Sequence, residues 1–197
     1  MLVDFRDLKV TPVDVALSGV SWVVLHSGVR RELAGSAYLE RVQQCQEGLR
    51  AVKEHHPEVV GMRDIEMSML EGLGIAKQRI RHVITENHRV LDAVEAVRTG
   101  DATALGQILS SAHHSLRDDY EVSCPQLDLL VELAEVQSGC FGARMVGGGF
   151  GGCTLNLVRT EAAPAFIEAV LGTYRSRVSE VPRSFTFDLV AGASVSA

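Results

Sequence analysis

The sequence predicts an α+β fold in which helices pack against a mainly antiparallel sheet. Strand-like runs come first, amphipathic helices fill the middle, and a strand–strand–helix–strand order closes the chain. Hydrophobic residues make up 46% of the 197 residues and charged residues 22%, which is typical of a globular chain with a substantial core. Together, the element order and the composition favour this fold class over an all-helical or all-strand one.

Three strands are expected near the N-terminus, over residues 1–7, 10–17 and 20–25. The run Val20–Leu25 is the strongest of them, because its residues are almost all apolar and several are β-branched. The first strands start without a lead-in. We therefore expect the sheet to need further strands upstream.

A run of helices is expected in the middle of the chain. Apolar residues recur at three- and four-residue steps over residues 36–54, 76–99, 102–116 and 125–137, and a shorter helix is expected over 62–73. Ser36 and Asp101 suit N-cap positions, and Gly100 suits the left-handed position after a helix. In the helix over 76–99, the predicted buried stripe includes Asn87, Val90 and Leu91.

A polar link without helical periodicity is expected over Ser115–Pro125. It contains the adjacent carboxylates Asp118 and Asp119. A carboxylate pair without a third ligand is a poor magnesium site, so we expect caps and an ion pair that position the following elements. Ser123-Cys-Pro-Gln126 fits a capping box, with Pro125 in the first turn of the next helix.

A cluster of glycines lies between two strands expected over residues 143–146 and 153–158. Its members are Gly147, Gly148, Gly149, Gly151 and Gly152, which surround Phe150. Glycine costs conformational entropy but allows positive φ and close approach. Two interpretations stay open from the glycines alone: a loop that approaches a phosphate or sugar, and a tight hairpin packed under a helix. A helix over 162–177 and a last strand over 184–190 follow.

Composition excludes several classes of protein. The net charge of −6, with both signs mixed, argues against a general nucleic-acid or anionic-membrane binder. The chain has no Gly-Lys dipeptide and so no Walker P-loop. Charged residues precede any long apolar run at the N-terminus, so we do not expect a signal peptide there. No apolar run is long enough to span a bilayer. The four cysteines contain no C-x-x-C pair, which favours a reduced, cytoplasmic setting.

Three stretches carry a family resemblance. The first runs from Val29 to Cys45 and reads V-R-R-E-L-x-G-S-A-Y-x-x-R-x-x-Q-C. The second combines Arg81–Asn87 with the segment Ser115–Asp128, and the third is Gly142–Cys153 with its glycine cluster. In this order they cover nearly the whole chain, and together they resemble the C-terminal half of the galactokinase family in the GHMP kinase superfamily.

The resemblance implies a fold and an activity. Residues 35–197 would form a GHMP-kinase C-terminal domain, and residues 1–34 would be strands left from the N-terminal kinase domain. The reaction would transfer the γ-phosphoryl group of ATP to the anomeric hydroxyl of galactose with Mg²⁺. The metal ligands would lie in the N-terminal half, so no metal ligand is expected in this chain.

The resemblance also implies site residues. Arg30 would be catalytic and lie beside the transferring phosphoryl group, and Tyr38 would bind the sugar hydroxyls. The loop of Gly147, Gly148, Gly149, Phe150, Gly151 and Gly152 would bind the cofactor in the cleft, so Gly148→Val is expected to abolish activity in a complete enzyme. Without the resemblance, Arg30 reads as a helix-entry salt bridge and Tyr38 as an ordinary half-buried aromatic.

Two departures from the family matter. Val146 stands where the family commonly has threonine. The family's sugar-binding segment, phosphate loop and catalytic aspartate are expected upstream of Met1, so the isolated chain is expected to be inactive. The expected partners are galactose, ATP and a separate chain that carries the N-terminal half, with no nucleic acid and no membrane. The alternatives are a non-catalytic galactose or nucleotide sensor, an N-acetylgalactosamine kinase, and a degraded gene product.

Overall fold

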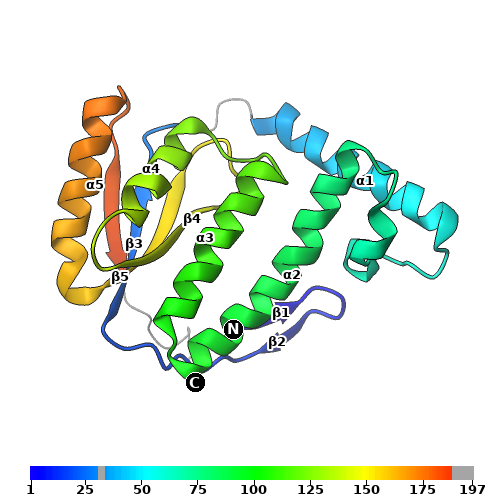
Figure 1. The fold of residues 1–197 in the computed structure, drawn as a ribbon, viewed down its shortest axis with the longest axis horizontal. Coiled ribbons are helices and arrows are strands. Elements are labelled where there is room, and N and C mark those ends of the chain that lie inside the picture. Colours follow the sequence, from blue (N-terminus) through cyan, green and yellow to red (C-terminus); the bar gives the residue numbers. More distant parts are fainter. Residues whose placement is uncertain (31–33, 188–197) are drawn as a thin grey trace, which may run out of the picture.

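The computed structural model describes residues 1–30 and 34–187, and it has the α+β architecture that the sequence predicts (Figure 1). A four-stranded antiparallel sheet has the order β4-β5-β3-β6, with β3 (Val20–His26), β4 (Cys140–Val146), β5 (Cys153–Arg159) and β6 (Arg183–Phe187). Strands β1 (Leu2–Asp4) and β2 (Lys9–Thr11) form a separate antiparallel hairpin. The helices are α1 (Ala34–His55), α2 (Ile75–Thr99), α3 (Ala102–Asp118), α4 (Pro125–Glu135) and α5 (Ala163–Arg177).

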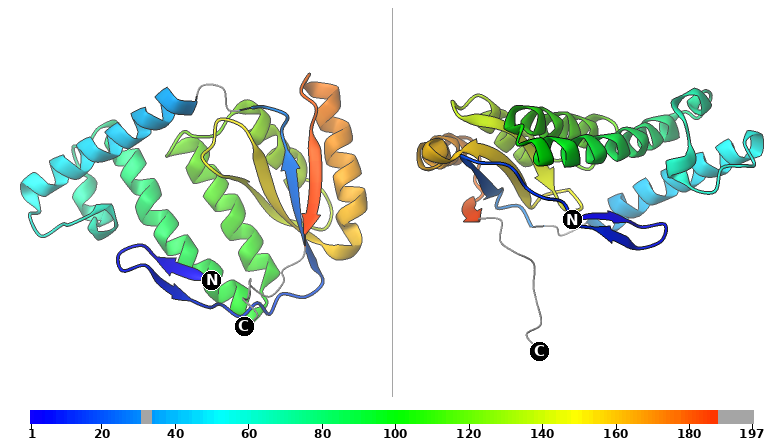
Figure 2. Two further views of the ribbon diagram at one scale, coloured as in Figure 1. Left: turned by 180° about the vertical axis from the view of Figure 1, so that it is seen from behind. Right: turned by 90° about the horizontal axis from the view of Figure 1, so that it is seen from below.

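Strand β3 has apolar partners on both of its faces. Val23 and Leu25 pack in a cluster with residues of α4 and α5, whereas Trp22 packs with Leu157 in a cluster that includes α2 and α3. Successive side chains of a strand point to opposite faces, so the two clusters lie on opposite sides of β3. The face that carries Trp22 is only partly covered, because its neighbours Phe185 and Phe187 of β6 are 54% and 43% exposed. The right-hand view of Figure 2 shows the long helices as a layer over the sheet.

Helix α3 and strand β4 touch through their backbones. A Cβ atom on Gly106 would lie 2.1 Å from the Phe141 carbonyl oxygen, and one on Gly142 would lie 2.0 Å from the Gly106 carbonyl oxygen. Only residues without a side chain allow this approach. The contact fixes the strand that leads into the glycine cluster.

The helix ends around residue 100 are as predicted. Gly100 has a φ of 73°, in the left-handed region. Asp101 caps α3, because its side chain accepts a hydrogen bond of 2.9 Å from the Ala104 amide.

The capping box predicted at Ser123 is wrong. Cys124 is the N-cap of α4 and its side chain makes no cap bond. The Ser123 hydroxyl instead donates to the carboxylate of Asp128, 2.5 Å away in the first turn. Helix α3 also continues through Asp118, so the polar link is shorter than predicted and spans residues 119–124.

The N-terminal strands are shorter than predicted, and no strand forms over residues 12–19. The helix predicted over 62–73 is a pair of 3₁₀ turns, η1 (Met62–Asp64) and η2 (Met67–Leu70), a form common in connectors. Ser36 lies inside the first turn of α1, and its side chain is outside the described residues, as are Arg31, Glu32 and Leu33. The last predicted strand is present to residue 187, and residues 188–190 lie outside the described range.

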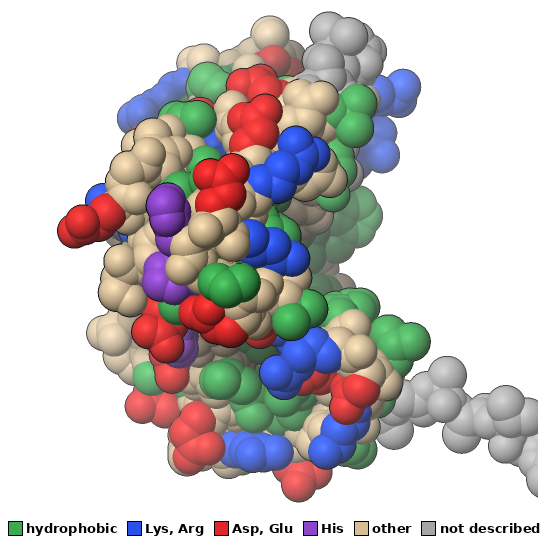
Figure 3. Space-filling model, turned by 90° about the vertical axis from the view of Figure 1, so that its right-hand side faces the viewer, with side chains coloured by type: hydrophobic (Ala, Val, Ile, Leu, Met, Phe, Trp, Pro, Cys, Tyr) green, Lys and Arg blue, Asp and Glu red, His purple; other side chains and the backbone are tan. Residues whose placement is uncertain are grey.

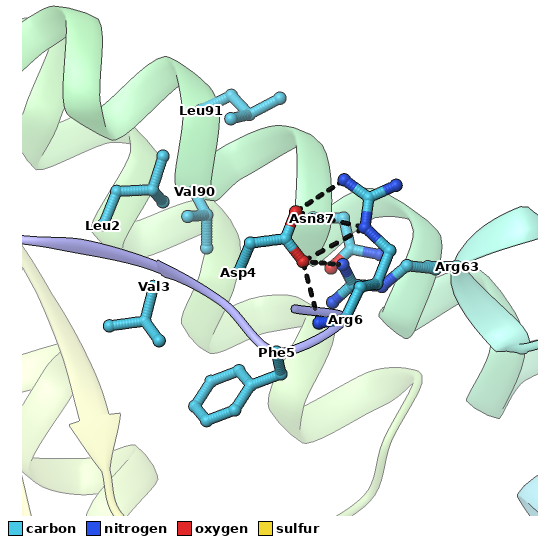
Figure 4. Close-up of a pocket in the computed structure, with 9 residues that line it drawn as sticks. All are labelled: Leu2, Val3, Asp4, Phe5, Arg6, Arg63, Asn87, Val90 and Leu91. Atoms are coloured by element: carbon cyan, nitrogen blue, oxygen red, sulfur yellow. Dashed lines mark hydrogen bonds and ion pairs between the residues drawn. The ribbon is translucent and has the colours of Figure 1, made fainter. Parts of the chain in front are cut away.

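The predicted burial of Asn87, Val90 and Leu91 is wrong. All three are exposed, with Val90 at 43% and Leu91 at 58%. Helix α2 packs on α1 and α3 with its other residues, and these side chains line an open hollow beside Leu2 of the β1–β2 hairpin (Figure 4). Periodicity marked an apolar stripe on the helix, but it did not show where along the helix the covering elements end.

The surface carries both charge signs, in agreement with the composition. Figure 3 shows acidic and basic side chains interspersed on the face at the α1 end, with hydrophobic side chains between them. No helix within residues 1–30 and 34–187 combines the length and the apolar character needed to cross a membrane.

Candidate active site

The glycine cluster forms the loop of the β4–β5 hairpin. Strand pairing ends at Val146 and Cys153, and the loop between them has a left-handed backbone at most positions. Positive φ occurs at Gly147 (86°), Gly149 (82°), Gly151 (131°) and Gly152 (92°), and also at the non-glycine residue Phe150 (59°). Glycine is the residue that adopts such a run without steric cost.

One side of the loop is anchored on Val122, in the link between α3 and α4. The Phe150 amide donates to the Val122 carbonyl at 2.7 Å. A Cβ atom on Gly149 would lie 2.0 Å from the same carbonyl oxygen. The Phe150 side chain packs at the edge of an apolar cluster that includes Leu116 and Val122.

The other side of the loop is anchored on the segment that follows β3. The Ser27 amide donates to the Gly152 carbonyl at 2.8 Å, and the Gly152 amide donates to the Val29 carbonyl at 3.3 Å. A Cβ atom on Gly151 would lie 3.0 Å from the Val29 carbonyl oxygen. The loop is therefore a packed hairpin, which is one of the two interpretations that the sequence left open.

The packed loop also borders an open hollow of about 460 Å³. The hollow is lined by His26, Val29, Arg30, Val146, Gly147, Gly152 and Cys153. The exposed Arg30 therefore shares one surface with the first and last glycines of the loop. Tyr38 does not line this hollow and lies on the second turn of α1 with 49% of its surface exposed.

His26 lines the hollow and was not predicted from the sequence. It is the last residue of β3, opposite Cys153 in the strand register. Its Nδ1 accepts a hydrogen bond of 2.9 Å from the Gly28 amide, so the proton of the neutral ring lies on Nε2. The signal that could have found it is a polar residue at the end of a buried strand, four residues before Arg30.

A buried histidine holds strand β4 just before the loop. Nδ1 of His113, which is 1% exposed, accepts a bond of 3.3 Å from the Met145 amide. Its Nε2 lies 3.3 Å from the Asp128 carboxylate. Burial raises the pKa of Asp128, but the His113 ring and the Ser123 hydroxyl lower it more, so the carboxyl has a pKa below its usual value.

The acidic pair of the link is divided between two roles. Asp118 pairs with Arg117 at the surface, whereas Asp119 accepts bonds from Arg81 and from the Ser115 hydroxyl. The predicted ion pair is therefore present, and Asp119 is the residue tied to α2. His82 adds a further contact, because its Nδ1 lies 3.0 Å from Ser115 Oγ.

His82 is uncharged at neutral pH. It is 7% exposed and its ring stacks on Tyr120 with centroids 4.6 Å apart. Burial lowers the pKa of His82 to about 4. Since the Ser115 hydroxyl donates to Asp119, it accepts the Nδ1 proton of the neutral His82 ring.

A second hollow lies between the β1–β2 hairpin and α2, and it contains none of the predicted site residues (Figure 4). Leu2, Val90 and Leu91 make one part of it apolar. The two arginines that border it, Arg6 and Arg63, both donate to Asp4. Because the charges of both arginines are already paired with Asp4, we assign no binding or catalytic role to this hollow.

Comparison with known proteins shows what this chain is similar to. Residues 93–176 match the family described as GHMP kinases C terminal. Over its full length the chain is 41% identical to a galactokinase of Chloroflexus aurantiacus, of which it covers 51%. The chain is similar to the C-terminal half of galactokinases. A human galactokinase is 41% identical over 83% of this chain and 42% of its own length.

Solved structures agree with the galactokinase similarity. The crystal structure of Lactococcus lactis galactokinase complexed with galactose matches 93% of this chain and 49% of its own chain, with a TM-score of 0.86 and 32% identity. Mevalonate kinase of L. major matches with a TM-score of 0.55 at 20% identity and thus shares the fold. The chain spans about half the length of the galactokinases it matches.

The galactokinase similarity bears on the alternatives. Each of the named relatives above about 30% identity is a galactokinase, so the comparisons do not favour the sensor or the N-acetylgalactosamine kinase alternative. The roles expected for Arg30, Tyr38 and the loop residues from Gly147 to Gly152 stay predictions. Of these, Arg30, Gly147 and Gly152 share the hollow, while Gly149, Phe150 and Gly151 contact neighbouring segments.

Proposed function

We propose that this chain is the C-terminal part of a galactokinase that phosphorylates galactose at its anomeric hydroxyl with ATP and Mg²⁺. The observation that carries the proposal is the shared hollow of Arg30 and the glycine loop in a chain with 41% identity to a galactokinase. Phosphoryl transfer needs a cation near the charge that develops on the transferring group. An exposed arginine beside a loop of glycines suits that requirement.

In this proposal the chain's residues have separate tasks. Arg30 stabilises charge on the phosphoryl group, and the His26 Nε2 proton adds a neutral donor to the same hollow. The glycines Gly147 and Gly152 allow a substrate to approach the backbone. Tyr38 contacts the sugar from the exposed side of α1.

The nucleotide loop, the magnesium ligands and the base belong to the N-terminal half, which would be the principal protein partner. The resemblance implied that residues 1–34 are part of that half's domain and that residues 35–197 form the C-terminal domain. The pairing of β3 with β5 and β6 favours a boundary before residue 20 instead. A cytoplasmic location is part of the proposal, because the sequence has four cysteines without a C-x-x-C pair.

The test joins this chain to the N-terminal half of the Chloroflexus aurantiacus galactokinase. We expect the chimera to form galactose 1-phosphate from galactose, ATP and Mg²⁺, and the chain alone to form none. Arg30→Ala should lower kcat of the chimera by about 10²-fold or more, as loss of a charge-stabilising donor does. Tyr38→Phe should mainly raise KM for galactose.

Two results would count against the proposal. A chimera that folds and binds galactose but turns nothing over would favour a sensor. Turnover unchanged by Arg30→Ala would remove the catalytic role of that residue.

A further inference from the structure

Glu121 has an unusual backbone for a residue with a side chain. Its φ is 52°, in the left-handed region that favours glycine. It lies in the link between α3 and α4, one residue before the Val122 carbonyl that anchors the glycine loop. A strained conformation persists where surrounding contacts fix it, and such residues cluster at functional sites.

The shortest contact that holds Glu121 comes from Arg79 of α2. Arg79 is 1% exposed, although its guanidinium is charged. Its Nη2 donates to Glu121 Oε2 at 2.6 Å, and its Nη1 donates to the Asp119 carbonyl at 2.5 Å. Its Nε donates to Gln44 of α1 at 2.7 Å. A buried arginine with three such acceptors holds three segments in one geometry.

Arg41 of α1 also donates hydrogen bonds to Glu121. Its Nη2 donates to Glu121 Oε2 and its Nε donates to the Glu121 carbonyl, each at 3.3 Å. Arg41 lies one helical turn after Tyr38. The helix that carries the proposed sugar contact is therefore tied to the turn at Glu121.

The segment around Glu121 also fixes the position of the glycine loop. The Val122 amide donates to the Leu116 carbonyl at 3.0 Å, which aligns the link with the end of α3. The Val122 carbonyl then accepts the Phe150 amide at 2.7 Å, and no Cβ fits at Gly149 beside it. Contacts thus continue from α1 and α2 through residues 119–122 to the loop.

We propose that Arg79 and Glu121 are a positioning pair that sets the glycine loop and the Tyr38 helix relative to each other. Neither residue lines the hollow, so they act through Val122 and Arg41. The consequence for catalysis rests on the proposed galactokinase function. The effect of the pair on order in the glycine loop does not depend on that function.

The first experiment measures amide hydrogen exchange in the full chain. In Arg79→Met we expect protection of the Phe150 amide to fall by about tenfold or more, because its acceptor is no longer held. Glu121→Gln is a second variant that folds more readily, because the side chain is 45% exposed and an oxygen acceptor remains. It should give a smaller loss at the same amide, and Arg79→Lys should restore part of the protection.

A matched control is Arg89→Gln, on the same helix. Arg89 pairs with Glu86 and Thr85 and bonds to no residue of the link. We expect this variant to leave Phe150 protection unchanged. Phe150 protection within twofold of wild type in both Arg79→Met and Glu121→Gln would overturn the proposal. So would an equal loss at all amides of the central strands, since the pair would then serve global stability only.

The second experiment separates this inference from the proposed function. In the galactokinase chimera, Glu121→Gln should lower kcat and change KM for galactose, while Arg89→Gln should change neither. An inactive chimera whose Phe150 exchange responds as expected would refute the function and leave the positioning pair in place. An active chimera with parameters unaffected by Glu121→Gln would refute the catalytic consequence of the pair.

Discussion

Replacement of Gly149 by alanine should lower the free energy of unfolding by more than the backbone strain at its positive φ would cause alone. The new Cβ would lie 2.0 Å from the Val122 carbonyl oxygen and 2.8 Å from Val122 Cβ. Real Cβ atoms do not approach within 3.0 Å, so the loop and the link must separate by about 1 Å. That separation breaks the bond of 2.7 Å between the Phe150 amide and Val122.

Two contributions set the magnitude of this effect. The φ of 82° at Gly149 costs an alanine about 1–2 kcal/mol. Loss of the Phe150 bond and of packing around a buried carbonyl costs about 1–3 kcal/mol more. We therefore expect the free energy of unfolding to fall by about 3–4 kcal/mol, the sum of middle values from both ranges.

Urea unfolding of the full chain, followed by circular dichroism, measures this loss. The matched control is Gly72→Ala, because Gly72 has a φ of 78° and nothing within 4 Å of its would-be Cβ. Gly72→Ala should cost about 1–2 kcal/mol, the strain contribution alone. Equal losses in the two variants would show that the close approach to Val122 does not matter.

Three further changes test other parts of the structure. Between pH 8 and 5, His82 should remove about 2 kcal/mol of stability: its pKa is about 4 when folded and 6.5 when unfolded, so only the unfolded state gains a proton as the pH falls. His82→Gln should flatten this part of the pH profile in urea titrations, and an unchanged slope would refute the assignment. Gly106→Ala places a Cβ 2.1 Å from the Phe141 carbonyl oxygen and should cost more than about 3 kcal/mol, measured by the same unfolding assay. Tyr174→Phe leaves the Ser27 carbonyl without its hydroxyl donor at 2.8 Å and should cost about 1–2 kcal/mol; a melting temperature equal to that of wild type would contradict this.

Local signals in the sequence were sufficient for the element order and for several helix ends. Gly100 and Asp101 end one helix and begin the next as predicted, because the conformation of each depends on its own residue and its nearest neighbours. The packed hairpin was one of two interpretations of the glycine cluster, and the glycines alone did not decide between it and a ligand-binding loop. The shared surface of Arg30 and this loop came from the family resemblance, not from periodicity.

The features that the sequence did not predict depend on contacts between residues that are far apart in the chain. Arg79 and Glu121 are 42 positions apart, and nothing in either local pattern marks them as partners. Arg79 reads from the sequence as one more charged helix residue, yet it is buried. For Val90 and Leu91 the error was the reverse: both were predicted to be buried and are exposed. Apolar periodicity indicates a stripe on a helix but not which elements cover it.

The two interpretations of the glycine cluster prove compatible once its positions are separated. Gly149 and Gly151 face backbone carbonyls that exclude a side chain, so their lack of one serves the packing of the hairpin. Gly147 and Gly152 line the hollow beside Arg30, where bare backbone suits a ligand. Gly148 is exposed and is not among the loop residues with positive φ, so an effect of Gly148→Val on activity would come from blocked approach and not from backbone strain. The same loop can therefore be rigid toward the protein and open toward a substrate.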